Sequence, residues 1–531
     1  MSRIRTIVVQ TCAVASQRMK MMKLTVVVCC VLAVPGMTSC SIENNDNPAP
    51  ESEPQADYTV LFYGGGGANL DAFFLQSMQG FYQADADVYK HVNVVVQYKY
   101  STSQNMLANG IPSDMAATFD RKTVRFAIDQ SKPEQLVAPS CFYGADNADV
   151  TNQDSLTNFI NWAAKNYPAK KYMLIVSNHG QGYVPHGDLP ATTPTRGLFP
   201  DDGNNNKLFS VNTLKQGIAS ANVKIETLIM WACMMGNLQY MFELKDVCDY
   251  IIASTYCMVT AGWAYDVLPA LLARKDIDIE QKLTAYSNAV NKAWDTSGVD
   301  EILGRYRDQT VTRTASLDQL GVMMREFTDR LCNTYTNGTE QQKQLIDKCT
   351  ATAVKVQDNY PHYDAAKYME SIMNALPEVY STEFYNQLAD AFNGCLVAQN
   401  YSAYLVSHNY QVDYSVLLGT DNSYLIAYWN KDPQTGVKTP YRALVYRADG
   451  TTEDFQLVPL EDNSSYYQMV STGAGNPWAS TFADTYCKLE FDRIVGWSRW
   501  LKMNRQQPNL FCPYGMNFEL PDGDLSNNPN I

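Results

Sequence analysis

Two residues that could act as a nucleophile and a base each follow a short apolar run. "KYMLIVSNHG" ends with His179 just after one run, and "ETLIMWAC" ends with Cys233 just after another. A cysteine in an apolar run is usually a core thiol, so a functional reading depends on its surroundings. Ligands of open α/β sheets bind at the carboxyl ends of the strands, and an imidazole near a thiol favours the thiolate that attacks carbonyl carbons. We therefore predict thiol-dependent acyl transfer at His179 and Cys233.

The backbone near this pair adds two further features. Gly180 follows the histidine and allows close approach, so its N–H and that of Cys233 could form an oxyanion hole. Asn237 is a favourable N-cap, and a helix starting there would direct its positive end toward Cys233. Apolar residues at the spacing of that helix are Met241, Leu244, Cys248 and Ile251. The other four histidines are interpreted as structural: His91, His186, His362 and His408.

Strand-like runs alternate with amphipathic runs along the first half of the chain. The strand-like runs cover residues 58–63, 92–98, 171–177, 226–232 and 250–255, and the helical runs cover 70–83, 154–167 and 211–220. Nearly continuous apolar runs are typical of strands that are buried on both faces of a parallel sheet. The sequence therefore predicts an α/β fold with a mostly parallel sheet flanked by helices.

The second half of the chain has a different pattern. Ser316 and Gln319 predict a capping box at the start of a long amphipathic helix, and further helices follow to about residue 395. Residues 401–458 combine strand-like runs with turn clusters, and residues 491–504 predict one helix that ends before Pro508. We expect helical and β-rich C-terminal additions to the sheet.

The N-terminus has the order of an export signal. Lys20 and Lys23 precede an apolar run, residues 24–37, that is too short to cross a bilayer. The run leads into "MTSC", which resembles the lipobox of bacterial lipoproteins and makes Cys40 the predicted lipidated residue. The next segment, rich in Pro, Ser, Asn and acid, predicts a flexible tether. We expect a lipid-anchored, exported protein of the bacterial cell envelope, on its periplasmic or surface face.

Composition and motifs exclude several classes of function. The 531-residue chain is 46% hydrophobic, which excludes global disorder, and its charge of −14 without a long Lys/Arg cluster excludes nucleic acid as an expected partner. "GGGG" at 64–67 lacks the Lys-Ser/Thr of a phosphate loop, and "DDGNNN" at 201–206 lacks the glycine and glutamate that complete an EF-hand loop. We therefore expect no cofactor and no metal.

Three segments together resemble the clostripain family of cysteine peptidases. They are "SNHGQGY", "WACMMGNLQ" and "IIASTYCMVTAGWAYD". Members of that family carry N-H-G after one strand, D-A-C-[LM]-M-G after the next, and a glycine–tryptophan loop after the third. The resemblance implies a caspase-like fold and a dyad that hydrolyses peptide bonds, with His179 as general base and Cys233 as nucleophile. It also leaves calcium use open, because calcium is reported for the type member.

One residue departs from the family pattern. Trp231 stands where the family has the aspartate that receives an Arg or Lys side chain of the substrate, and an indole cannot balance a buried guanidinium as a carboxylate does. Trp263 is predicted as a second aromatic residue near the same pocket, with core packing as the alternative. We expect a specificity that is not strictly for Arg or Lys. Members of the family can also cleave themselves between the histidine and the cysteine. In this sequence the corresponding loop, 184–207, contains Arg196 and Lys207. Without the aspartate, however, there is no reason to expect self-cleavage at a basic residue.

The predicted organisation follows from these segments. It comprises a signal peptide (1–40), a tether (41–57), a caspase-like peptidase domain (58–310), a helical region (311–398) and a β-rich region with a C-terminal helix (399–531). The expected partners are a polypeptide substrate and the membrane that holds the lipid. The alternative is a catalytically inactive caspase-like lipoprotein that binds partners at the surface, with residues 401–458 as the contact region.

Overall fold

The computed structural model describes most of the chain from Ala56 onward. The described residues are 56–180, 182–183, 198–204, 207–256, 258, 263–296, 306–356, 362–418, 424–431, 438–446, 452–459, 466–471, 486–504 and 511–513. The predicted signal peptide, Cys40 and all but the last two residues of the tether lie outside these ranges, as does Arg196. Among the described helices, none has both the length and the apolar character needed to cross a bilayer.

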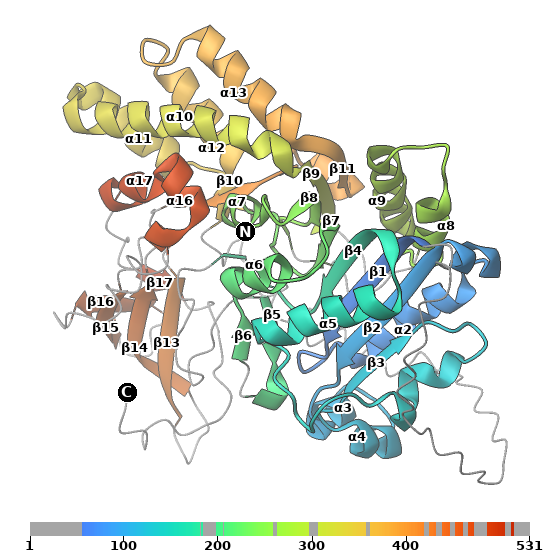
Figure 1. The fold of residues 1–531 in the computed structure, drawn as a ribbon. Helices are drawn as coiled ribbons and strands as arrows, with labels where there is room; N and C mark the ends of the chain where they lie inside the picture. Colours follow the sequence, from blue (N-terminus) through green and yellow to red (C-terminus); the bar gives the residue numbers. More distant parts are fainter. Residues whose placement is uncertain are drawn as a thin grey trace, which may run out of the picture.

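An eight-stranded sheet with the order β11-β9-β8-β7-β4-β1-β2-β3 forms the centre of the fold (Figure 1). Its parallel strands are β1 (Ala56–Gly65), β2 (Val92–Lys99), β4 (Ala169–Ser177), β7 (Ile225–Trp231) and β8 (Cys248–Ala253). Antiparallel strands complete the sheet on both sides: β3 (Thr123–Ala127) is one edge, and β9 (Asp308–Arg313) pairs with β8 and with β11 (Leu396–Tyr401), the other edge. The predicted α/β class with a mostly parallel sheet is confirmed.

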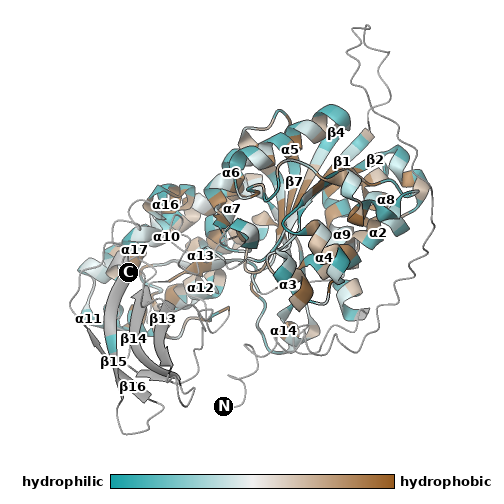
Figure 2. Cartoon of the chain, turned by 90° about the horizontal axis from the view of Figure 1, so that it is seen from below, coloured by the Kyte–Doolittle hydropathy of each residue, from teal (hydrophilic) through white to brown (hydrophobic). Residues whose placement is uncertain are grey.

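Helices cover both faces of this sheet because successive side chains of its strands point to opposite sides. Leu61 and Tyr63 of β1 pack into one core, and Val60 and Phe62 pack into the other. The first core includes α5 (Gln153–Asn166), α6 (Val211–Ala219) and α7 (Leu238–Leu244). The second includes α2 (Asp71–Gln83), α3 (Ser103–Ala108), α4 (Ser113–Phe119), α8 (Leu268–Ala273) and α9 (Ile279–Thr296). Figure 2 shows the apolar strands between these helices.

The helix after Asn237 is shorter than predicted. Asn237 is its N-cap as expected, because the side-chain Oδ1 accepts a hydrogen bond from Tyr240 N at 2.9 Å. The helix ends at Leu244, however, and Cys248 and Ile251 belong to β8, where they pair with β7. The assignment of these two residues to the helix is therefore wrong, since apolar residues three apart also occur on a strand that is buried on both faces.

The segment from residue 306 to 418 is largely helical. It contains α10 (Leu317–Asn337), α11 (Glu340–Ala351), α12 (Ala365–Ala375), α13 (Thr382–Cys395) and α14 (Ala403–Ser407). The predicted capping box is wrong: Ser316 has helical backbone angles (φ −80°, ψ −13°) because a 3-10 turn runs directly into α10, and its side chain makes no capping bond. β9 and β11, which flank α10 to α13 in the sequence, both join the central sheet.

The remaining elements form smaller units. β10 (His362–Asp364) pairs with β12 (Ser415–Leu417), β5 (Leu198–Asp201) pairs with β6 (Lys207–Phe209), and a five-stranded sheet contains β13 (Tyr424–Lys431), β14 (Lys438–Tyr446), β15 (Thr452–Pro459), β16 (Tyr466–Ser471) and β17 (Phe511–Pro513). The single helix predicted for 491–504 is two helices, α16 (Glu490–Val495) and α17 (Trp497–Met503). Gly496 separates them because its φ of 71° is left-handed.

Candidate active site

The register of β4 and β7 brings the two predicted catalytic residues to the same edge of the sheet. These strands are parallel neighbours, and Ser177 is aligned with Trp231. The pairing continues for one more residue, where Asn178 N donates to Trp231 O at 3.2 Å. His179 and Cys233 each lie two residues beyond the aligned pair, and both line one pocket. The expected meeting of these residues at strand ends is thus present in the structure.

His179 is held in one orientation by a residue that the sequence analysis did not single out. Its Nε2 lies 2.6 Å from Oδ1 of Asn69, in the turn that follows β1. Because an amide oxygen only accepts, this contact places the ring proton on Nε2 and leaves Nδ1 as the basic nitrogen. Burial lowers the pKa of His179 below its usual 6.5, so the ring is neutral at pH 7. Such a ring can accept a proton from a thiol.

Cys233 lies in a turn that is held by hydrogen bonds with the segment after β8. The amide of Met258 donates to Cys233 Sγ at 3.2 Å, and a donor at this place favours the thiolate. The next residue, Met234, has a left-handed φ of 64°, which is costly for a side chain of this size. Its N–H donates to Tyr256 O at 2.9 Å, so the segment after β8 holds the turn in this shape. Strain of this kind is concentrated at functional sites.

The turns after β4 and β7, which carry His179 and Cys233 and are named the catalytic turns after these candidate residues, touch at Gly180. A Cβ added to Gly180 would lie 2.4 Å from Cys233 O and 2.9 Å from Cys233 N. Only glycine allows this approach without a shift of the backbone. The contact brings the two predicted oxyanion-hole donors, the N–H groups of Gly180 and Cys233, into one small region.

The pocket beside His179 and Cys233 is largely aromatic, and none of the described residues that line it is an Asp, Glu, Lys or Arg. The rings of Trp231 and Trp263 are stacked with their centroids 4.4 Å apart, and both residues are buried. The pocket has a volume of about 50 Å³. Other residues that line it are Phe62, Phe73, Phe74, Ser77, Tyr98 and Tyr265. Both tryptophans predicted to bind the substrate therefore line the pocket, and their stacking also serves core packing.

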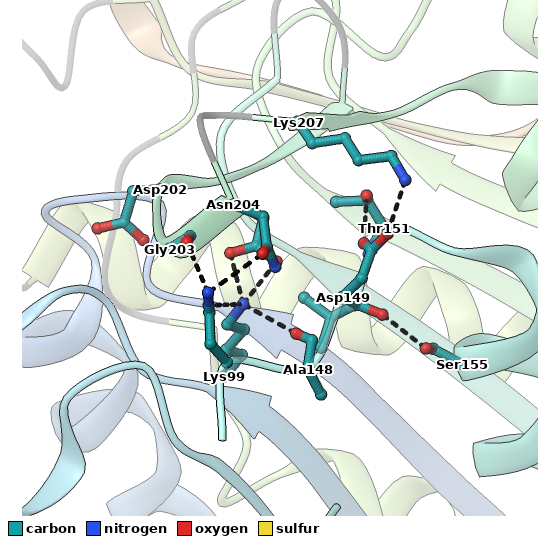
Figure 3. A network of polar contacts seen from close by, with 12 residues as sticks. Lys99, Ala148, Asp149, Thr151, Ser155, Asp202, Gly203, Asn204 and Lys207 are labelled. Atoms are coloured by element: carbon teal, nitrogen blue, oxygen red, sulfur yellow. Dashed lines mark hydrogen bonds and ion pairs between the residues drawn. The ribbon is translucent and has the colours of Figure 1, made fainter. Parts of the chain in front are cut away.

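A buried ion pair of Lys99 and Asp201 is linked to the turn of His179 through β5. Figure 3 shows the network of polar contacts around Lys99. Lys99 Nζ, at the end of β2, lies 2.7 Å from both carboxylate oxygens of Asp201 and also donates to Asn147 Oδ1 and Ala148 O. Asp201 ends β5, and Phe199 N of the same strand donates to His179 O at 2.9 Å. From the "DDGNNN" region, only Asp201 contacts this ammonium, and the other two oxygens come from residues 147 and 148. In the described part of the chain, no group of three or more His, Cys, Asp or Glu side chains is arranged to hold a metal.

Three other cysteines of the described chain, Cys248, Cys332 and Cys395, have the character of core thiols. Cys332 and Cys395 are buried, and burial raises the pKa of Cys332 to about 11 and that of Cys395 to about 12. Burial also raises the pKa of Cys248, far above its usual value. These thiols are protonated and inert at pH 7. Cys233 differs from them because it is only partly buried and lines a pocket with a histidine.

Comparison with known proteins assigns the family. The sequence model of the clostripain family matches residues 63–471, which is more than half of the chain. The chain belongs to the clostripain family. Its mostly parallel sheet, with the histidine and the cysteine after neighbouring strands, is the caspase-like arrangement that the resemblance implied.

Individual members of the clostripain family are similar to this chain at low identity. The clostripain of Hathewaya histolytica is 27% identical over 128 residues, which are 22% of this chain and 24% of that protein. The matched region therefore spans about a quarter of that relative's length. A secreted C11 cysteine protease from Bacteroides thetaiotaomicron in complex with an irreversible peptide inhibitor is 13% identical, with a TM-score of 0.49 and coverage of 83% and 99% of the two chains. An inactive zymogen C11 protease from Parabacteroides distasonis is 14% identical, with a TM-score of 0.47 and coverage of 84% and 99%.

Proposed function

We propose that this chain is a cysteine endopeptidase in which Cys233 is the nucleophile and His179 is the general base. The observation that carries the proposal is the shared pocket at the carboxyl ends of β4 and β7, which an imidazole and a thiol both line. Membership of the clostripain family supports the same chemistry. The substrate is a polypeptide. The N-terminal sequence supports export and anchoring through a lipid at Cys40.

The proposed reaction passes through a thioester acyl-enzyme. His179 Nδ1 accepts the thiol proton, and the thiolate of Cys233 attacks the carbonyl carbon of the scissile peptide bond. The N–H groups of Gly180 and Cys233 stabilise the resulting oxyanion. The imidazolium donates its proton to the leaving amine, and a water that His179 deprotonates then hydrolyses the thioester and restores the thiol.

We further propose that the residue before the cleaved bond is uncharged, with an apolar or aromatic side chain. Trp231 replaces the aspartate of the family, and none of the described residues that line the pocket is an Asp or Glu. Moving a guanidinium from water into such a site costs several kcal/mol because its charge is left without a partner. The stacked rings of Trp231 and Trp263 offer apolar contact surface instead.

The proposed dyad needs no metal or other cofactor, since each step uses only the thiol, the imidazole, backbone N–H groups and water. Self-cleavage at a basic residue is likewise not part of the proposal. Lys207 supports this, because it lies in β6 and its Nζ pairs with Asp149 Oδ2 at 2.6 Å.

Peptide hydrolysis by the wild type and by Cys233→Ala tests the proposal. Both proteins are incubated with a peptide mixture digested from a proteome, and new termini are identified by mass spectrometry. We expect cuts only with the wild type, enriched after uncharged apolar or aromatic residues. Equal cutting by Cys233→Ala would contradict the nucleophile, and cuts confined to Arg and Lys would contradict the specificity. A folded wild type that cuts nothing would favour the inactive binding lipoprotein.

A further inference from the structure

A small sheet far along the chain contacts both catalytic turns. β10 and β12 form this two-stranded sheet, which lies next to α7 (Figure 1). His362 Nε2 of β10 lies 2.9 Å from Tyr183 O, and Tyr183 is four residues after His179. Ser415 N of β12 donates to Gly236 O at 2.9 Å, three residues after Cys233. The same two strands therefore hold the segment after each catalytic residue.

A side-chain hydrogen bond joins the two contacts. Ser415 Oγ lies 3.3 Å from His362 Nδ1, and both residues are buried. Tyr183 O can only accept, so His362 carries its proton on Nε2 and accepts at Nδ1 from the serine hydroxyl. Burial lowers the pKa of His362 to about 4, which keeps the ring neutral near pH 7. The result is a continuous chain from Tyr183 O through His362 and Ser415 to Gly236 O.

The turns are shaped to receive this pair. Gly182 has a left-handed φ of 72°, and a Cβ there would lie 2.7 Å from His362 Nε2. On the other side, Asn237 pairs with Ser415 in a parallel bridge, and Asn237 Nδ2 donates to Met234 O at 3.0 Å. Contact with Ser415 is thus transmitted to the residue directly after the nucleophile. Neither His362 nor Ser415 lines the pocket itself.

We propose that His362 and Ser415 are positioning residues that set the separation of the imidazole and the thiol by clamping the two turns together. This rests on the proposed peptidase function. Adjacent strand ends alone fix the dyad only as far as Asn178 and Trp231, because the main-chain pairing of β4 and β7 stops there. Beyond that point, a displacement of about 1 Å costs roughly 100-fold in rate.

Four variants separate positioning from a purely structural role. His362→Phe removes both ring hydrogen bonds and keeps a flat side chain, Ser415→Ala removes the hydroxyl, and His362→Gln keeps one donor and one acceptor. Thr350→Val is the matched control. Its hydroxyl is buried and bonded to Tyr368 in the helical region, away from the pocket.

We expect His362→Phe and Ser415→Ala to lower kcat roughly 10- to 100-fold with KM nearly unchanged, and His362→Gln to recover most of the rate. The double variant His362→Phe/Ser415→Ala should lose no more than the worse single variant, because both act in one chain of bonds. Thr350→Val should lower thermal stability without lowering kcat. If His362→Phe does not fold, Ser415→Ala and His362→Gln carry the test.

A second readout does not depend on peptide cleavage. Alkylation of Cys233 by iodoacetamide at pH 7 follows the local thiolate population, and we expect it to slow in His362→Phe and Ser415→Ala and not in Thr350→Val. The proposal would be overturned if His362→Phe and Ser415→Ala fold and keep the wild-type kcat and alkylation rate. It would also be overturned if Thr350→Val lost as much kcat and alkylation rate as they do. A wild type without peptidase activity would refute the proposed function, while the alkylation rates would still decide whether the clamp acts on the dyad.

Discussion

Gly180→Ala would place a methyl group where the two catalytic turns touch. The added Cβ would lie 2.4 Å from Cys233 O, whereas ordinary van der Waals contact begins at 3.4 Å, so the turns must separate by 1.0 Å along that direction (3.4 − 2.4). The obstructing atoms belong to the backbone and cannot rotate away. A misplacement of about 1 Å costs roughly 100-fold in rate, which corresponds to about 2.7 kcal/mol in the activation free energy.

The assay compares kcat and KM of Gly180→Ala and the wild type on one peptide substrate. Thermal unfolding is measured in parallel. Gly394→Ala is the matched control, because a Cβ at this exposed site in α13 would meet no atom within 4 Å. We expect a loss in kcat of roughly 100-fold for Gly180→Ala and no loss for the control, which should be unchanged or slightly more stable. A Gly180→Ala enzyme with kcat within about threefold of the wild type would refute the close contact and the oxyanion-hole assignment.

Three further predictions concern pH, the buried ion pair and metals. Because burial lowers the pKa of His179, this base is still neutral at pH 6.5, the usual pKa of a histidine. We therefore expect kcat/KM to fall on the acid side only below pH 6.5, and a fall centred at or above pH 6.5 would contradict this. Lys99→Met leaves Asp201 buried without its cation, so urea denaturation should show that the free energy of unfolding falls by about 3–5 kcal/mol. For Lys207→Met, at an exposed pair, it should fall by less than about 1 kcal/mol. Equal decreases in the two variants would count against a stabilising role of the buried pair. Dialysis against EDTA should leave peptide turnover unchanged, and a loss that calcium restores would show that the chain uses the metal.

Local sequence signals predicted most of the sheet and the position of His179 and Cys233 after neighbouring strands. The five parallel strands were predicted from apolar runs that alternate with helical runs. A strand that is buried on both faces is apolar at nearly every position, so it can be recognised from a short stretch of sequence. The cap at Asn237 was predicted because it depends on neighbours within one turn. Local patterns led to wrong predictions in two places. At Cys248 and Ile251, apolar residues three apart fit a helix and also a strand that is buried on both faces. At Ser316, a preceding 3-10 turn gives the residue helical backbone angles, so it does not cap the helix.

Long-range partners could not be predicted from the sequence. Asn69 lies 110 residues before His179, and no local pattern connects them. His362 was interpreted as structural, and nothing near it in the sequence indicates a bond to Tyr183, 179 residues away. The pairing of Lys99 with Asp201 likewise depends on how β2 and β5 meet in the fold. Such contacts follow from tertiary packing, so the sequence indicated the two candidate reacting groups and not the distant residues that contact them.

Covalent labelling tests most directly whether Cys233 is an activated nucleophile paired with His179. Peptide acyloxymethyl ketones with leucine, phenylalanine or arginine next to the reactive group are incubated with the wild type, Cys233→Ala and His179→Ala, and adducts are mapped by mass spectrometry. We predict one adduct per chain on Cys233 with the leucine or phenylalanine probe, none in Cys233→Ala, and strongly slowed labelling in His179→Ala. Labelling of a different cysteine, or labelling of Cys233 that is unaffected by the loss of His179, would contradict the dyad.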